Sequence, residues 1–304
     1  MTDITIQNRN LKLAASVYGP ASCDPVLFLH GITNSRDTWL EMVEALRDRY
    51  RIWTLDFRGH GHSDRAQSYE LHDYVSDAQA ALSAIGRPAI LVGHSLGGCV
   101  AGILAQSGQL NVRAAFLEDP PWYLGDKKEW DRSLVSKTFP LIISAQASLQ
   151  GKNASLEEYV SLLSNAPSPM GGTARDHITE RHLFSHASGL QRQDPRCWGD
   201  ENEQRPKQRL GVIDVTKPFR CATKVLRGEE RLGAVLFEDH QRLLMQTNPN
   251  TEVVLYSGCG HLMHQNKSFE GRYREPRAFS YCFMIDVIRT DEIAFRQDQA
   301  SQAS

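Results

Sequence analysis

Residues 89–98 read AILVGHSLGG, an apolar run that leads into Gly93, Ser95 and Gly97. The stretch that follows at 100–108, VAGILAQSG, is compatible with a helix. Between a strand and a helix, a GxSxG motif puts its serine on a sharp turn, where the hydroxyl stands above the sheet. The glycines beside the serine remove side-chain clashes at that turn. The motif therefore predicts Ser95 as a nucleophile.

Other short apolar, β-branched runs recur along the chain, with helical-looking segments between them. This alternation is typical of parallel strands covered by crossover helices. We expect an α/β fold with a mostly parallel central sheet flanked by helices, preceded by an antiparallel pair. The expected core strands are VLFLH (26–30), RIWTLDF (51–57), AILVGH (89–94), AAFLED (114–119), KVLRG (224–228) and TEVVLYS (251–257).

The interval 122–216 interrupts this rhythm because it is long, mostly helical in pattern and without a convincing buried strand. Its helical patterns lie at 128–149 and 155–166. We interpret the interval as an inserted helical cap. The core domain would then comprise residues 1–121 and 217–304.

The composition indicates a soluble globular protein, with 41% hydrophobic and 23% charged residues. The 34 basic and 36 acidic residues are mixed along the chain and leave a net charge of -2, which argues against nucleic acid as a partner. The N-terminus has no basic start or cleavage site, and no run of about 18 apolar residues follows. We therefore expect a cytoplasmic protein with no membrane partner.

The six cysteines form neither a CxxC pair nor the tight Cys/His spacing of zinc sites, so reduced thiols are expected. His182 and His186 have an i, i+4 spacing that could bind a metal, but no third ligand is evident in the sequence. We expect no metal and no cofactor. Nothing in the sequence predicts the oligomeric state.

Four segments resemble the α/β-hydrolase superfamily and occur in its order. They are FLHGITNSRDTW (28–39), LDFRGHGHSD (55–64), VGHSLGG (92–98) and SGCGHLMH (257–264). The resemblance implies an α/β-hydrolase fold in which His261 is the general base and the backbone N–H groups of Ile32 and Leu96 form the oxyanion hole. His264 is the rival base. In LDFRGHGHSD, we expect Asp56 and Arg58 to have structural roles.

The acid of the triad departs from the commonest family pattern, because Arg231 stands where many relatives carry it. Some members instead take the acid from the end of the strand after the nucleophile helix, where this chain has Glu118 and Asp119. Alternation along a strand sends these two side chains to opposite faces, so we expect one of them to reach His261. We choose Glu118, with Asp119 and Glu230 as alternatives.

The expected reaction is hydrolysis of a carboxylic ester or lactone through an acyl-enzyme on Ser95. Because no charged cluster is evident near the motifs and aromatic residues enter the cap, we expect a small apolar substrate. Candidate pocket residues are His30, Trp122 and Tyr123. The alternatives are a C–C bond hydrolase of a ring-cleavage product and a non-catalytic small-molecule receptor.

Overall fold

The computed structural model describes residues 1–199 and 210–270, which form an eight-stranded sheet with the order β1-β2-β4-β3-β5-β6-β7-β8. The β1–β2 and β2–β4 pairs are antiparallel, and the other neighbours are parallel. The strands are β1 (Thr2–Asn8), β2 (Leu11–Tyr18), β3 (Pro25–Leu29), β4 (Arg51–Leu55), β5 (Ala89–His94), β6 (Val112–Glu118), β7 (Ala222–Arg227) and β8 (Glu252–Leu255). The expected α/β fold, its six core strands and the preceding antiparallel pair are confirmed.

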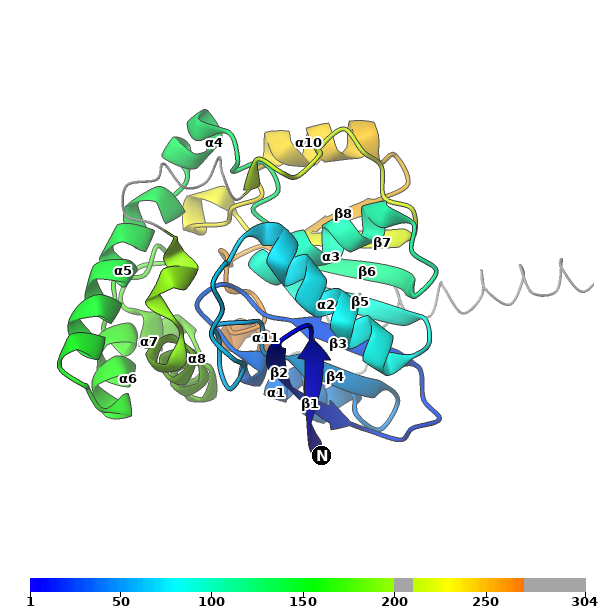
Figure 1. The fold of residues 1–304 in the computed structure, drawn as a ribbon. Coiled ribbons are helices and arrows are strands. Elements are labelled where there is room, and N and C mark those ends of the chain that lie inside the picture. Colours follow the sequence, from blue (N-terminus) through cyan, green and yellow to red (C-terminus); the bar gives the residue numbers. More distant parts are fainter. Residues whose placement is uncertain (200–209, 271–304) are drawn as a thin grey trace, which may run out of the picture.

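Helices cover both faces of the sheet, which explains why its central strands are apolar along their whole length. The side chains of β3 alternate: Leu27 and Leu29 pack in a cluster with α2 and α3, while Val26 and Phe28 pack in another with α1. Figure 1 shows α2 and α3 lying across one face. The helices are α1 (Leu40–Leu46), α2 (Leu71–Ile85), α3 (Leu96–Ser107), α10 (Glu238–Thr247) and α11 (Lys267–Glu270), with 3-10 turns η1 (Arg36–Trp39) and η3 (Glu230–Leu232).

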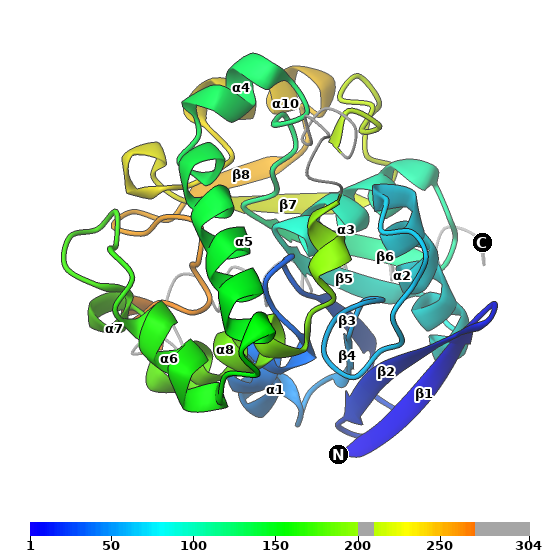
Figure 2. The same cartoon turned by 60° about the vertical axis from the view of Figure 1, so that its left-hand side comes forward.

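The described part of the chain between β6 and β7 consists of helices joined by turns and loops, and these helices lie together beside the sheet (Figure 2). The pattern predicted at 128–149 is divided between two helices, because Ser133 adopts extended backbone angles. The elements are α4 (Lys127–Arg132), α5 (Val135–Gly151), α6 (Leu156–Ser164), α7 (Ala174–His177), α8 (Glu180–Arg192) and the 3-10 turn η2 (Pro195–Trp198). The division into a core and a cap at 122–216 stays a prediction.

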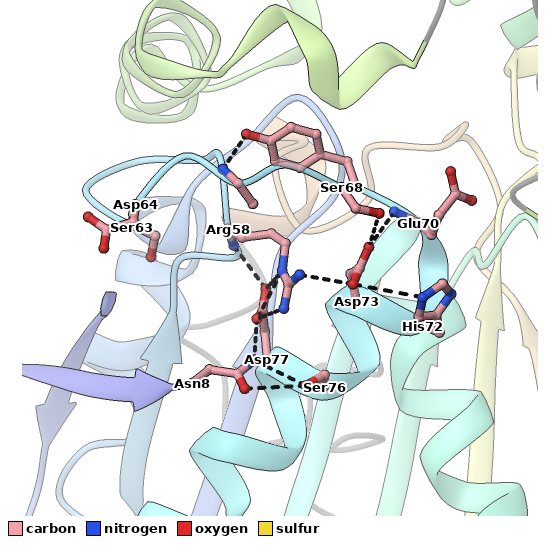
Figure 3. Close-up of polar contacts among 12 residues, drawn as sticks. Asn8, Arg58, Ser63, Asp64, Ser68, Glu70, His72, Asp73, Ser76 and Asp77 are labelled. Carbon is pink, nitrogen blue, oxygen red and sulfur yellow. Dashed lines mark hydrogen bonds and ion pairs between the residues drawn. The ribbon is translucent and has the colours of Figure 1, made fainter. Parts of the chain in front are cut away.

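A buried ion pair holds the loop after β4 against α2. The Arg58 guanidinium donates through Nε and Nη2 to Asp77 of α2, with the shortest distance 2.7 Å, and its Nη1 lies 3.0 Å from Asp73 (Figure 3). Asn8 at the end of β1 donates to the same Asp77 carboxylate at 2.8 Å. These internal contacts agree with the structural role expected for Arg58.

No helix in the described part of the chain is long and apolar enough to cross a membrane. The sequence also indicates a polar C-terminal tail at 288–304 and an insertion after His261, NKSFEGRYREPRAF at 266–279. The tail and most of this insertion lie outside the described residues.

Candidate active site

Ser95 lies on a strained turn between β5 and α3, as the GxSxG motif predicts. Its φ of 54° and ψ of -116° are uncommon for a residue with a side chain. A Cβ on Gly93 would lie 2.1 Å from the Gly97 carbonyl oxygen, and a Cβ on Gly97 would lie 2.1 Å from that of Leu29. The turn can therefore form only with glycine at both positions.

The predicted oxyanion-hole residues lie on the two segments that meet at Ser95. Leu96 is the first residue of α3, where helical N–H groups have no partner within the helix. Ile32 follows Gly31, and a Cβ on Gly31 would lie 3.3 Å from the Ser95 Cβ. Neither the Ile32 nor the Leu96 N–H has a hydrogen-bond acceptor among the residues that the structure describes. Both donors are thus available close to the serine.

His261 is paired with Asp119. Its Nδ1 lies 2.7 Å from the Asp119 Oδ2 atom. The same carboxylate accepts the backbone N–H groups of Val235, at 2.9 Å, and Leu236, at 3.0 Å. An ionised carboxylate only accepts, so Nδ1 of His261 carries the hydrogen and Nε2 is left as the acceptor. The His261 side chain is 21% exposed while that of Asp119 is fully buried, so this base is fixed on one side and open on the other.

Glu118, the acid that we chose from the sequence, lies against a different histidine. Its Oε1 accepts the backbone N–H of His264 at 3.0 Å and lies 2.9 Å from the ring Nδ1. One of the two acids does reach His261, as expected, but the choice of Glu118 is wrong: β6 ends at Glu118, and Asp119 has a φ of 40°. This left-handed conformation turns the Asp119 carboxylate toward His261, so the partner of His261 is the alternative acid. Glu230, the third candidate, is exposed at the start of η3.

Glu118 nevertheless contacts both sides of the site. Its backbone carbonyl accepts the Ser95 N–H at 3.0 Å, while its carboxylate holds the loop that carries His261. Burial raises the pKa of Glu118 above its usual range, an effect opposed by the nearby His94 and the His264 N–H. We therefore assign Glu118 a structural contact with the loop.

His264, the rival base, is enclosed. Its side chain is 1% exposed, its Nε2 lies 2.8 Å from the Thr38 hydroxyl, and its ring stacks on Trp39. Burial lowers its pKa to about 3, with a further contribution from His261. Both ring nitrogens are engaged, so His264 is not placed to exchange a proton with a substrate.

A possible metal-binding arrangement occurs beneath the serine, where ligand atoms of His94, Glu118 and His264 lie within 4.8 Å of one another. The hydrogen bonds between Glu118 and His264 already engage this carboxylate. The pair noted in the sequence is not a chelate: the ring nitrogens of His182 face the Thr179 hydroxyl and the Thr38 carbonyl. We assign no metal ion to either group.

The side chains of the three residues suggested for the substrate pocket are packed against other residues. His30 is fully buried, with its ring nitrogens on the backbone of Gly31 and Phe57. Trp122 is 2% exposed and packs over Gly102 of α3, while the Tyr123 ring lies tilted against that of His240. His30 and Trp122 are buried and Tyr123 is half-buried against His240, so we do not carry these three residues into the proposed site.

One group of residues near the site was not singled out from the sequence. Gln193, which follows α8, donates through Nε2 to the Ile32 carbonyl at 2.6 Å. Gln146 on α5 in turn donates to Gln193 at 3.2 Å. Glutamines are ordinary in a helical segment, and no spacing in the sequence distinguishes these two. The contact becomes visible once α8 is packed against the loop after β3.

Comparison with known proteins gives the same class. Residues 24–136 match the family model of the α/β hydrolase fold. Lipase LipV of Mycobacterium tuberculosis is 36% identical over 266 residues, which cover 86% of this chain and 95% of the lipase. 2-(Acetamidomethylene)succinate hydrolase of Mesorhizobium japonicum is 28% identical over 264 residues, covering 84% and 87%. The chain therefore belongs to the α/β-hydrolase fold family of enzymes, as its motifs indicate.

Solved structures with low sequence identity to this chain share its fold. The crystal structure of a bromoperoxidase from Bacillus anthracis has a TM-score of 0.66 with 18% identity, and the match covers 90% of this chain and 96% of that one. The named relatives act in different reactions, so the substrate of this chain has to be argued from its own site.

Proposed function

We propose that the protein is a serine hydrolase of small carboxylic esters or lactones, with Ser95 as nucleophile, His261 as base and Asp119 as acid. The observation that carries the proposal is the 2.7 Å contact between His261 and Asp119. Because Nδ1 of His261 is engaged by Asp119, Nε2 of this partly exposed imidazole is left to accept a proton, on the loop next to the Ser95 turn. His94, which precedes Ser95 in the chain, connects the turn to this loop, with its Nε2 3.0 Å from the His261 carbonyl oxygen.

The residues divide the reaction into two acyl transfers. The Ser95 hydroxyl oxygen attacks the substrate carbonyl carbon while His261 Nε2 takes its proton, and the Ile32 and Leu96 N–H groups donate to the oxyanion. His261 returns the proton to the leaving alkoxide, which completes the acyl-enzyme. Water then attacks with His261 again as base, which releases the acid and restores Ser95. Asp119 keeps Nδ1 of His261 protonated throughout.

The choice of ester or lactone rests on the apolar helical surroundings of the site and on a full-length relative named as a lipase. Ile32 packs against a cluster of apolar side chains from α5, α6 and α8, which includes Phe139, Ile142 and Leu163. Such surroundings favour an apolar acyl or alcohol group over a charged one.

The test is hydrolysis of p-nitrophenyl esters and of simple lactones across acyl lengths, combined with labelling by a fluorophosphonate probe. Wild type should turn over repeatedly and bind the probe. Ser95→Ala should do neither while remaining folded by circular dichroism. Labelling of Ser95 without turnover of any ester or lactone would contradict the proposed substrate and favour the C–C hydrolase alternative. Turnover by Ser95→Ala would refute the mechanism.

A further inference from the structure

A row of buried polar side chains runs from the helices between β6 and β7 to the loop after β3. It consists of Trp198 of η2, Gln146 of α5 and Gln193, and it ends on the carbonyl oxygen of Ile32. None of the three side-chain residues is more than 5% exposed. Buried amides are costly unless their hydrogen bonds are satisfied, so each orientation along this row is determined by its neighbours.

The row has a fixed direction. The indole N–H of Trp198 only donates, so the side-chain oxygen of Gln146 must face it. The Gln146 amide nitrogen then donates to the Leu190 carbonyl at 2.8 Å and to the side-chain oxygen of Gln193 at 3.2 Å. The remaining end of Gln193 is its amide nitrogen, which faces the Ile32 carbonyl. The hydrogen bond from Gln146 thus fixes the orientation of the Gln193 amide, with its NH2 group toward the Ile32 carbonyl.

His60 reaches the same carbonyl from beside Gln193, and its Nε2 lies 3.2 Å from the Gln193 Nε2. Its Nε2 lies 2.8 Å from the Ile32 oxygen, and its Nδ1 lies 2.9 Å from the Arg58 carbonyl oxygen. A neutral imidazole carries one hydrogen and can donate to one of these two oxygens. The Gln193 amide carries hydrogens in every state, so it supplies a hydrogen bond to Ile32 whichever tautomer His60 adopts.

We propose that Gln193 is a positioning residue for the oxyanion hole. Gln193 belongs to the helical segment between β6 and β7, and it acts on a loop of the sheet-bearing part of the chain. The proposal rests on the proposed function, in which the Ile32 N–H stabilises the oxyanion. The carbonyl and N–H of Ile32 flank one Cα, so holding the carbonyl restricts the rotation that would move the N–H away from Ser95. Gln193 itself touches neither the substrate nor the reacting atoms.

The test replaces Gln193 with methionine, which has similar length and no amide. The matched control is Gln150→Met, because Gln150 lies one turn beyond Gln146 on α5 and donates to the Gln193 backbone carbonyl at 3.0 Å without reaching Ile32. We expect Gln193→Met to lower kcat by between about tenfold and 100-fold with KM within about twofold. Affinity for an alkyl boronic acid should fall with kcat, since the boronate also needs the oxyanion donors. Gln150→Met should retain wild-type values.

A second readout does not depend on activity. Hydrogen exchange measured by mass spectrometry should be faster in peptides covering residues 30–36 of Gln193→Met and unchanged there in Gln150→Met. Gln146→Met, which breaks the row one link earlier, should give a smaller change of the same kind. Wild-type kcat and unchanged exchange in Gln193→Met would overturn the proposal. Faster exchange in a protein that hydrolyses no ester or lactone would uphold the anchoring of Ile32 while refuting the proposed function.

Discussion

The Asp119→Asn substitution tests the assignment of the acid most directly. Three N–H groups converge on this carboxylate, from His261, Val235 and Leu236. An asparagine amide has one oxygen and one NH2 group, so it cannot accept all three hydrogen bonds. If the oxygen stays on Leu236, the NH2 group faces His261 and favours the tautomer with hydrogen on Nε2. That tautomer cannot accept the proton of Ser95.

The size of the loss follows from this change of tautomer. A comparable exchange in a serine protease triad lowers kcat by about 10⁴-fold, so we expect a loss of about 10³- to 10⁴-fold here. At 1.36 kcal/mol for each factor of ten, the corresponding cost in transition-state stabilisation is about 4–5.5 kcal/mol. KM should change little, because Asp119 is buried and does not reach the substrate.

The assay is steady-state hydrolysis of p-nitrophenyl butyrate, with thermal unfolding followed by circular dichroism to show that each variant is folded. The matched control is Glu118→Gln. Its amide oxygen can still accept the His264 N–H, so we expect kcat within about tenfold of wild type and a stability loss of about 1 kcal/mol. Near-normal activity in Asp119→Asn together with an inactive Glu118→Gln would refute this assignment.

Two further predictions concern stability. Arg58→Leu should lower the free energy of unfolding by about 3–5 kcal/mol, because it leaves the Asp77 carboxylate buried without its ion-pair partner; a urea midpoint equal to that of wild type would contradict this. Burial lowers the pKa of His186 to about 4 from an ordinary 6.5, so below pH 6.5 the unfolded state binds a proton that the folded state does not. The stability that His186 contributes is complete above pH 6.5 and is lost as the pH falls toward 4. In urea titrations at several pH values, the free energy of unfolding should therefore fall more steeply with decreasing pH in wild type than in His186→Leu, by about 1.4 kcal/mol per pH unit between pH 6.5 and 4. Equal slopes in the two proteins would contradict the prediction.

The sheet could be predicted from the sequence because its central strands are buried on both faces. A run such as AILVGH is apolar throughout, which distinguishes it from the polar connections on either side. The turn that carries Ser95 could be predicted for a related reason, since Gly93 and Gly97 meet backbone atoms that leave no space for a side chain. These are local constraints, and they are visible in a short stretch of sequence.

The choice between Glu118 and Asp119 depended on geometry that the sequence does not specify. Alternation holds inside a strand, but whether Asp119 belongs to the strand is decided by its left-handed φ. The role of Gln193 was hidden for a different reason. Its partners Gln146 and Ile32 are distant in sequence, and the contact depends on how α5 and α8 pack.

The three donors on Asp119 have a consequence for the order in which the enzyme can mature during synthesis. Ser95 and Asp119 directly follow adjacent strands and are translated early, but the N–H groups that stabilise the buried carboxylate belong to residues 235, 236 and 261. Until those residues have left the ribosome, the carboxylate has neither its structural donors nor its imidazole. In the proposed mechanism, a nascent chain that has folded its first strands therefore has Ser95 without its base, and Ser95 becomes reactive only once the loop after β8 is in place.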